Sequence, residues 1–243
     1  MIKYSIIIPT LNEEKLLPNL LETLSDSEFK KKYEYEIIIS DGGSTDSTIL
    51  VAEKYADKII EINNDEKQNI AMGRNIGAQN ASGEFFIFFN GDIYPKNLEK
   101  VFKKIEDKII NSDYAAISSF VKVFPDEEKF IDKIFSTFYS YYFWSLNIFG
   151  LGMGRGECHI LSRKIFEEFG GYNENLAAGE DFDLYKRIRK KYKIYTARDL
   201  IVYESPRRYR KLGHFRILFT WLINSIYIIF TKKSKSNEWK PIR

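Results

Sequence analysis

The stretch 84-EFFIFFNGDIYP-95 decides the fold prediction. Five of its first six residues are apolar, which is typical of a strand buried on both faces of a sheet. The chain then turns polar at Asn90, Gly91 and Asp92. A carboxylate at the end of a buried strand costs free energy unless something pairs with it. We therefore expect Asp92 to hold a cation or a ligand.

The residues upstream repeat this arrangement of strand, polar turn and helix. The segment 4-YSIIIPTLNEE-14 predicts a strand and a turn, followed by a helix in which Pro18 marks a kink or a late start. The segment 35-YEIIISDGGSTDST-48 predicts a second strand, a sharp turn and a helix. Strands that alternate with helices indicate a parallel sheet with helices on its faces, which is an α/β fold.

Composition limits the classes of protein. The chain has 243 residues, of which 44% are hydrophobic and 29% charged, so it can form one large globular domain. Its net charge of +3 is too small to predict a nucleic-acid partner. The single Cys158 excludes an internal disulfide. The apolar run that ends at Pro9 is too short for a signal peptide, so we expect a cytoplasmic location.

Three polar clusters fall where the predicted strands end. They are Pro9 and Thr10, then Asp41, and then the turn from Asn90 to Asp92. Ligands of parallel α/β sheets bind at the carboxyl ends of the strands. Three clusters at one edge of the sheet predict a binding site there. We see no linker that would divide the chain, and we predict one domain over residues 1–210, followed by a C-terminal segment, 211–243.

Five segments, in this order, resemble the family 2 glycosyltransferases, which are inverting enzymes with the GT-A fold. They are "SIIIPTLNEE", "IIISDGGSTDST", "GRNIGAQNASGEFFIFFNGD", "GGYNE" and "GEDFDLYKRI", between Ser5 and Arg208. The resemblance implies a mostly parallel central sheet flanked by helices, with a nucleotide-binding half at 1–95 and an acceptor half at 96–210. It implies transfer of a sugar from a nucleotide-diphosphate donor, with uracil as the expected base and Mg²⁺ or Mn²⁺ as the cofactor.

The resemblance also assigns the donor site. In it, Glu13 faces the ribose and Asp41 the base edge, although Asp41 also suits a turn before Gly42, where the family often has Asp. Arg74 would reach a phosphate, with a solvated helix arginine as the alternative. The nucleotide-binding residues that it implies are Pro9, Thr10, Leu11, Glu13, Asp41, Arg74, Asn90, Gly91 and Asp92.

The metal ligand implied by the resemblance is Asp92. The family usually carries Asp-x-Asp at this point, and here Asn90 replaces the first acid. An Asn carbonyl can bind a hard cation but adds no negative charge. This replacement suggests a weaker metal site, an indirect role for Asn90, or a further ligand elsewhere. His214 is a candidate for that ligand, with a surface histidine as the alternative.

The resemblance places the general base at Asp181, which would take the proton from the acceptor hydroxyl. Glu180 would orient Asp181 or the acceptor. The alternative is structural, because acidic residues at a helix N-terminus stabilise the helix. The basic stretch 205-SPRRYRK-211 could bind phosphate or the acceptor through Arg207, Arg208, Arg210 and the nearby His214, or be a solvated loop.

The C-terminal segment contains the apolar run 215-FRILFTWLINSIYIIF-230. It falls short of the ~20 residues that span a bilayer. Basic residues flank it at 207–211 and 232–235, which favours an amphipathic helix on a membrane surface, with the aromatic stretch 135–149 beside it. Core packing of a C-terminal apolar helix, or a homodimer interface, is the alternative.

The sequence thus predicts an inverting, metal-assisted glycosyltransferase at the inner face of the cell membrane. It would transfer a sugar from a nucleotide-diphosphate sugar to a hydroxyl or phosphate on a glycan or lipid-linked acceptor. Two rivals remain: a polyprenyl-phosphate glycosyltransferase, and a non-catalytic glycosyltransferase-like binding protein, against which Asp181 argues. A dinucleotide-binding oxidoreductase is excluded, because no glycine-rich fingerprint follows the first strand.

Overall fold

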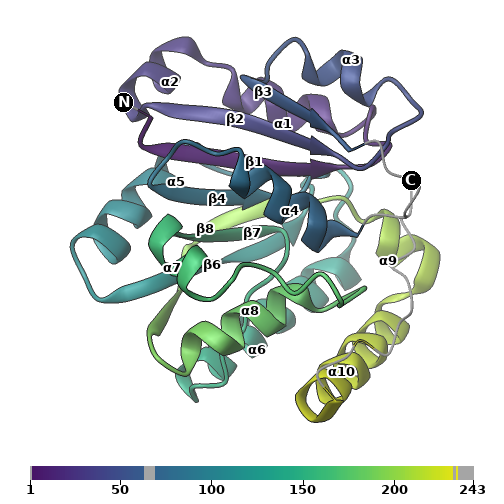
Figure 1. Ribbon diagram of the computed structural model, residues 1–243. Helices are drawn as coiled ribbons and strands as arrows, with labels where there is room; N and C mark the ends of the chain where they lie inside the picture. Colours follow the sequence, from purple (N-terminus) through teal and green to yellow (C-terminus); the bar gives the residue numbers. More distant parts are fainter. Residues whose placement is uncertain (1, 63–68, 232–233, 235–243) are drawn as a thin grey trace.

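The computed structural model describes residues 2–62, 69–231 and 234. These residues form one eight-stranded sheet with helices on both faces (Figure 1). The strands are β1 (Tyr4–Thr10), β2 (Tyr35–Asp41), β3 (Lys58–Glu61), β4 (Phe85–Phe89), β5 (Ile93–Pro95), β6 (Tyr114–Val123), β7 (Cys158–Ser162) and β8 (Lys193–Glu204). The helices are α1 (Leu17–Leu24), α2 (Ser27–Tyr33), α3 (Thr48–Ala52), α4 (Ile70–Gln79), α5 (Leu98–Ile105), the π-helix η1 (Glu106–Ile110), α6 (Phe130–Ile148), α7 (Arg163–Glu168), α8 (Glu180–Arg189), α9 (Arg207–Leu212) and α10 (His214–Thr231).

The strand order is β3-β2-β1-β4-β7-β6-β8-β5. Strands β3, β2, β1 and β4 are parallel, as the alternation of strands and helices predicts. In the second half β7 runs antiparallel to both β4 and β6, while β6 and β8 are parallel and β5 is antiparallel to β8. The prediction of a mostly parallel sheet is confirmed. Because β5 and β8 pair, residues before and after 95 share one sheet, and the division into two halves stays a prediction.

Hydrophobic layers cover both faces of the sheet. Ile6 and Ile8 of β1 belong to a core with residues of α1, α2 and α5. Ile7, between them, belongs to a second core with residues of α4, α7 and α8. Alternate residues of one strand point to opposite faces, so a strand covered on both sides is apolar throughout. This explains why β1, β2 and β4 read as continuous apolar runs.

Helix α1 begins at Leu17, with Pro18 in its first turn. A proline there loses no helical hydrogen bond, because the first N–H groups have no partner within the helix. The late start predicted from Pro18 is therefore confirmed, and residues 11–16 form a loop between β1 and the helix. This loop lies at the carboxyl end of β1.

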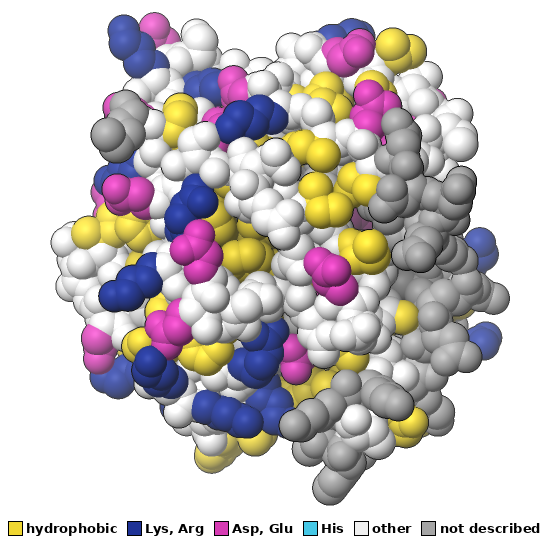
Figure 2. Space-filling view, viewed as in Figure 1, with side chains coloured by type: hydrophobic (Ala, Val, Ile, Leu, Met, Phe, Trp, Pro, Cys, Tyr) yellow, Lys and Arg dark blue, Asp and Glu magenta, His cyan; other side chains and the backbone are white. Residues whose placement is uncertain are grey.

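Two surfaces of the molecule differ in character. On the face shown in Figure 2, basic and acidic side chains are interspersed, with hydrophobic side chains between them. Helices α6 and α10 instead lie side by side, with the Phe135 and Phe215 rings 5.2 Å apart and those of Tyr139 and Trp221 5.4 Å apart. Both helices expose large apolar side chains. We name five exposed phenylalanines the α6–α10 face; they belong to α6, to its C-cap and to α10, and are Phe130, Phe138, Phe149, Phe215 and Phe219.

The C-terminal helix packs against the rest of the protein through one of its sides. Ile217, Asn224 and Ile228 of α10 are buried, and their spacing places them on one face of the helix. This face of α10 therefore packs against the core, which was the alternative to a helix on a membrane surface. No helix among the described residues is long and apolar enough to cross a membrane. The basic residues at 232–233 and 235–243 lie outside the described residues.

Candidate active site

The loops that follow β1 and β2 are bonded to each other at one edge of the sheet. The backbone N–H of Asn12 donates to Ser44 Oγ at 2.8 Å, and the N–H of Thr45 donates to Asn12 Oδ1 at 2.7 Å. The N–H of Glu13 donates to Thr48 Oγ1 at 2.8 Å. These contacts fix the backbone before Glu13, which is one of the residues expected to face the donor.

Asp41 is buried at the end of β2, and its carboxylate accepts four hydrogen bonds. Thr10 Oγ1 and Ser44 Oγ donate to Oδ2 at 2.8 and 2.6 Å. The backbone N–H groups of Gly43 and Ser44 donate to Oδ1 at 3.0 and 2.7 Å. These bonds match the turn interpretation of Asp41 and join the ends of β1 and β2. A contact between Asp41 and a base stays a prediction.

Glycines set how closely α4 approaches β1. A Cβ atom on Gly77 would lie 2.4 Å from Ile7 Cγ2, and one on Gly73 would lie 3.1 Å from Pro9 Cβ. A side chain at position 77 would therefore push α4 away from the sheet. Because α4 lies so close to the sheet, Arg74, which follows Gly73, lies in the interior, and its exposed fraction is 0%. The alternative of a solvated helix arginine is wrong.

Arg74 connects the end of β4 to the start of α8. Its Nη1 donates to Glu180 Oε1 at 2.6 Å, and its Nη2 donates to Asn90 Oδ1 at 2.9 Å and to the Gly156 carbonyl at 2.6 Å. Its guanidinium carbon lies 5.1 Å from the centre of the Tyr172 ring. Asn90 therefore accepts a hydrogen bond from Arg74, and its amide oxygen is engaged in the interior of the site.

Asp181 lies in the first turn of α8. The helix begins after Gly179, whose φ of 85° is a left-handed conformation that favours glycine. Burial, followed by repulsion from Glu180, raises the pKa of Asp181 to about 7, although the charge of Arg74 acts in the opposite direction. A carboxylate with a pKa near neutrality is suited to accept a proton in a reaction at pH 7.

Gly156 lies beside both of these groups. A Cβ atom at this position would lie 3.2 Å from Arg74 Nη2 and 3.4 Å from Asp181 Oδ2. Gly156 was not predicted from the sequence. The signal was the run 150-GLGMGRGE-157, in which glycine occupies alternate positions and Gly156 lies between the charged residues Arg155 and Glu157.

A second arginine joins the loop after β1 to the turn after β4. Arg207 Nη2 donates to Glu13 Oε1 and Oε2 at 2.7 and 2.9 Å, and to Asp92 Oδ2 at 3.0 Å. Gly91 allows this approach, because a Cβ atom there would lie 3.2 Å from Glu13 Cγ. Burial alone would lower the pKa of Arg207, but its hydrogen bond to Glu13 and the charge of Asp92 more than offset this effect, so the pKa of Arg207 is raised. The structure therefore brings Glu13, Asp92 and Arg207 together.

Arg210 and His214 contact a different carboxylate, that of Asp132 in α6. Arg210 donates from both terminal nitrogens to Asp132, and His214 Nε2 lies 2.7 Å from Asp132 Oδ1. Against the opposing effect of burial, the hydrogen bonds from Arg210, Lys129 and His214 lower the pKa of Asp132 to about 2. Arg210 and His214 thus hold α9 and α10 against α6. The structure does not bring His214 to Asp92, and its expected place as a metal ligand stays a prediction without a contact to support it.

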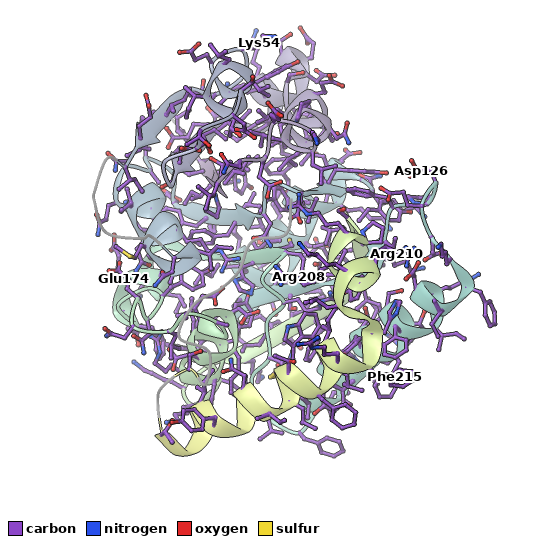
Figure 3. The ribbon with its side chains drawn as sticks, turned by 90° about the vertical axis from the view of Figure 1, so that its right-hand side faces the viewer. Lys54, Asp126, Glu174, Arg208, Arg210 and Phe215 are labelled. Carbon is purple, nitrogen blue, oxygen red and sulfur yellow. The ribbon has the colours of Figure 1, made fainter. Side chains whose placement is uncertain are left out.

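Arg208 follows Arg207 and precedes Arg210 in the sequence, and its side chain is partly buried. In Figure 3, α9 and α10 face the viewer, with Arg208 toward the centre of the molecule and Phe215 near the edge where α10 begins. Burial lowers the pKa of Arg208, while the nearby charge of Asp92 raises it. The effect of burial is the larger of the two, so the pKa of Arg208 is lowered.

A buried cluster of charged side chains lies at the end of β8, and it was not predicted from the sequence. Arg155 Nη2 donates to Glu204 Oε1 at 3.0 Å, and Arg155 also pairs with Glu157 at 3.3 Å. Burial, with Arg155 opposing and Glu157 reinforcing, raises the pKa of Glu204 to about 8. Tyr209 donates to the same Glu204 oxygen at 2.7 Å, which ties α9 to the end of β8.

The residues at the end of β4 could supply some of the ligands of a divalent cation. Among the described residues no group of three or more His, Cys, Asp and Glu side chains could hold a metal ion. However, Asp92 and Glu13 already surround one positive group, the Arg207 guanidinium, with three carboxylate oxygens. Mg²⁺ is typically held by one or two carboxylates together with substrate phosphates. Asp92, with Glu13 beside it, is a suitable donor set for such an ion.

The fold and this edge of carboxylates and arginines are those of a nucleotide-sugar transferase of the GT-A class. The model of glycosyl transferase family 2 matches residues 5–170, and the chain belongs to this family. It is a glycosyltransferase by family. The match ends before Glu180, Asp181 and Arg207, so these residues lie outside the matched region.

Individual relatives match parts of the chain. The poly(ribitol-phosphate) beta-N-acetylglucosaminyltransferase TarS of Staphylococcus aureus is 37% identical over 97 residues, which are 39% of this chain and 17% of TarS. The dolichyl N-acetyl-alpha-D-glucosaminyl phosphate 3-beta-D-2,3-diacetamido-2,3-dideoxy-beta-D-glucuronosyltransferase of Methanococcus voltae is 42% identical over 96 residues, 38% of this chain and 30% of that protein. An uncharacterized glycosyltransferase of Rickettsia felis is 31% identical over 218 residues, 82% of this chain and 33% of that protein. The chain thus spans a third or less of these relatives.

Solved structures share the fold over nearly the whole chain. TarS 1–349 of S. aureus in complex with UDP-GlcNAc superposes with a TM-score of 0.63 at 18% identity, covering 95% of this chain and 74% of that one. The mannosyltransferase PcManGT of Pyrobaculum calidifontis, in complex with GDP-Man and Mn²⁺, gives a TM-score of 0.64 at 18% identity, covering 89% and 64%. At these identities the likeness establishes the GT-A fold.

Proposed function

We propose that this chain is an inverting glycosyltransferase that transfers a sugar from a UDP-sugar to an acceptor hydroxyl. One observation carries the proposal. A carboxyl group with a pKa of about 7, Asp181, lies in the same cluster as Arg74, Glu180 and Asn90, and Asn90 is two residues from Asp92. A base that Arg74 links, through Glu180 and Asn90, to the turn carrying a cation-binding carboxylate supplies the two groups that a single displacement at an anomeric carbon needs.

On the acceptor side, ionised Asp181 takes the proton of the acceptor hydroxyl while the oxygen forms the new glycosidic bond. The bond from the anomeric carbon to the diphosphate breaks in the same step, and its electron pair leaves with the nucleoside diphosphate. Arg74 holds Glu180 at 2.6 Å, which fixes the first turn of α8 and therefore the position of Asp181. Glu180 is in this proposal a positioning residue.

On the donor side, Asp92 would hold Mg²⁺ or Mn²⁺ together with the diphosphate. When bound, the ion supplies positive charge against the negative charge that develops on the leaving diphosphate. Arg207 and Arg208, at the start of α9, are the chain's own cations at this place. Pro9, Thr10, Leu11 and the Asp41 turn, at the ends of β1 and β2, would receive the nucleoside, with Glu13 toward the ribose.

The acceptor class is supported by the names of relatives. TarS is named for transfer of N-acetylglucosamine to poly(ribitol-phosphate), and the M. voltae relative for transfer to a dolichyl-linked sugar phosphate. We propose a glycan acceptor, either free or linked to a lipid. Transfer to a polyprenyl phosphate itself is the second candidate, and the basic residues at the start of α9 favour it because arginine binds phosphate through two parallel hydrogen bonds.

We further propose that the protein works in the cytoplasm, peripherally bound at the inner face of the cell membrane. The support is the α6–α10 face, where Phe130 and Phe149 are each 80% exposed and Phe215 is 66% exposed. Aromatic side chains of this kind insert at a lipid surface. Flotation with vesicles of anionic lipid tests this: the protein should float with them, and recovery of a dimer that stays at the bottom of the gradient would favour a homodimer interface instead.

The test of the donor is calorimetric titration with UDP, GDP, dTDP and CDP, each with and without Mn²⁺. We expect UDP to bind most tightly and only with the metal present. The variant Asp181→Asn should bind UDP as the natural protein does, while its transfer rate falls by about 10²–10⁴, the usual contribution of a general base. Absence of binding by all four nucleotides would favour the non-catalytic alternative.

A further inference from the structure

One guanidinium group occupies the place where the donor's metal ion is expected. The single atom Nη2 of Arg207 contacts both oxygens of Glu13 and one oxygen of Asp92, at 2.7, 2.9 and 3.0 Å. Arg74 has no such arrangement, because its terminal nitrogens are divided between Glu180, Asn90 and a backbone carbonyl. The Nη2 atom of Arg207, by contrast, contacts carboxylates of the predicted donor site.

The two carboxylates need a cation between them. Glu13 is on the loop after β1 and Asp92 on the turn after β4, and packing of Gly91 against Glu13 holds these segments together. The Glu13 side chain is 7% exposed and that of Asp92 is 26% exposed. Two negatively charged carboxylates that contact the same atom in a partly buried place repel each other strongly unless a positive group lies between them. Arg207 supplies that positive charge from a part of the chain 194 residues away from Glu13.

The position of the Arg207 side chain allows it to move away from Glu13 and Asp92. It is the first residue of α9, and 21% of its side chain is exposed. The other end of α9 is fixed, because Arg210 and His214 are bound to Asp132 of α6. A change of the Arg207 side chain therefore requires no movement of α9 as a whole. A guanidinium group can also form two parallel hydrogen bonds to a phosphate, whereas the three contacts with carboxylate oxygens described above all come from the single atom Nη2.

We propose that Arg207 is an exchangeable internal cation of the donor site. Without ligand it neutralises Glu13 and Asp92; when a divalent cation arrives with a nucleoside diphosphate, the ion takes Asp92 and the Arg207 guanidinium moves to the diphosphate. This inference rests on the proposed function for the identity of the second ligand only. The exchange makes binding of the metal and of the diphosphate cooperative, because the metal alone must displace Arg207 without offering it a new partner.

The exchange predicts opposite effects of one substitution on two affinities. In Arg207→Gln the competing charge is gone, so the affinity for Mn²⁺ alone should rise, by about ten-fold for one unit charge at this distance in a partly exposed site. The affinity for UDP in the presence of saturating Mn²⁺ should fall, because the diphosphate loses a cation. Damage to the fold would lower both affinities, so the opposite signs distinguish exchange from a purely structural role.

The experiment is a titration of the full chain with Mn²⁺ alone, followed by the electron paramagnetic resonance signal of the free ion. Arg207→Gln should bind Mn²⁺ more tightly than the natural protein, and Arg207→Lys, which keeps the charge, should not. Arg210→Gln is the matched control, since Arg210 lies on the same helix but contacts Asp132. Equal or weaker Mn²⁺ binding by Arg207→Gln, in protein with an unchanged circular dichroism spectrum, overturns the proposal.

A second measurement covers the case in which Arg207→Gln does not fold. The side-chain Nε–H resonance of Arg207 in the natural protein, assigned with Arg207→Lys, should shift when Mg²⁺ and UDP are added together, and much less with Mg²⁺ alone. A resonance that does not move with both ligands bound overturns the exchange. If no nucleotide binds at all, the proposed donor is wrong, whereas the Mn²⁺ titration without nucleotide still decides whether Arg207 competes for the two acids.

Discussion

Two arginines of the site, Arg74 and Arg207, differ in their surroundings. Arg74 comes from the middle of α4 and is fully buried, with partners in the turn after β4, in residue 156 and in α8. Arg207 comes from the first turn of α9 and is partly exposed, with two carboxylates as its partners. The comparison teaches that the same side chain serves to fix one half of a site and to leave the other half adjustable, depending on how far water is excluded.

The largest expected difference between the two arginines is in stability. Replacing Arg74 by Gln removes three hydrogen bonds and leaves Glu180 buried without its partner, which typically costs about 3–5 kcal/mol of unfolding free energy. Replacing Arg207 by Gln leaves Glu13 and Asp92 without their cation at a place that water partly reaches, and should cost less, about 1–3 kcal/mol. Urea unfolding followed by circular dichroism measures both values. Equal losses for the two variants would show that Arg207 is as fixed as Arg74.

The next effect concerns the pH dependence on the Arg74 side. Asp181 accepts a proton only when it is ionised, so kcat/KM should rise with pH and reach half of its plateau near the pKa of about 7. Glu180 contributes to raising this pKa. In Glu180→Gln the midpoint should therefore move to lower pH, because the repulsion is gone and Arg74 attracts Asp181 more strongly.

Glu174→Gln is the control for this pH profile, since Glu174 lies on an exposed loop, where it accepts from Asn75 at 2.7 Å. Its midpoint should be that of the natural enzyme. A profile that is flat between pH 5 and pH 9 would remove Asp181 from the role of base, whatever the effect of Asp181→Asn on the rate.

The smallest expected effect is that of Asn90→Asp, which restores the Asp-x-Asp pattern. Arg74 Nη2 lies 2.9 Å from Asn90 Oδ1, so a carboxylate at this position would pair with Arg74 and add little to the metal site. We expect the affinity for Mn²⁺ to change by less than about three-fold. Asp92→Asn, by contrast, should abolish measurable binding. A large gain in Asn90→Asp would mean that Arg74 is less firmly held than the structure indicates.

The first half of the fold could be predicted because its signals are local. The apolar runs of β1, β2 and β4 and the polar turns after them lie within short stretches of sequence, and a parallel sheet places their ends together without further information. The position of β7, antiparallel between β4 and β6, could not be predicted from such local signals. It depends on pairing between strands far apart in the chain, which apolar periodicity does not record.

The partners of the charged residues could not be predicted for the same reason. Arg74 and Glu180 are 106 residues apart, and Arg210 and Asp132 are 78 apart. In the sequence, Asp132 is an ordinary charge before an aromatic stretch, and nothing near it indicates that Arg210 and His214 will bind it. The sequence indicated which charged residues to consider for the site, whereas the partner of each arginine could be identified only from the fold.

Helices α9 and α10 contact both sides of the reaction centre. Arg207 holds Glu13 and Asp92, and Asn224 Nδ2 of α10 donates to the Ala178 carbonyl at 3.1 Å, just before α8 begins. During synthesis the strands β1 to β4 leave the ribosome long before these helices exist, and chains generally begin to fold from the N-terminus. Glu13 and Asp92 therefore stay without their internal cation until α9 has been made.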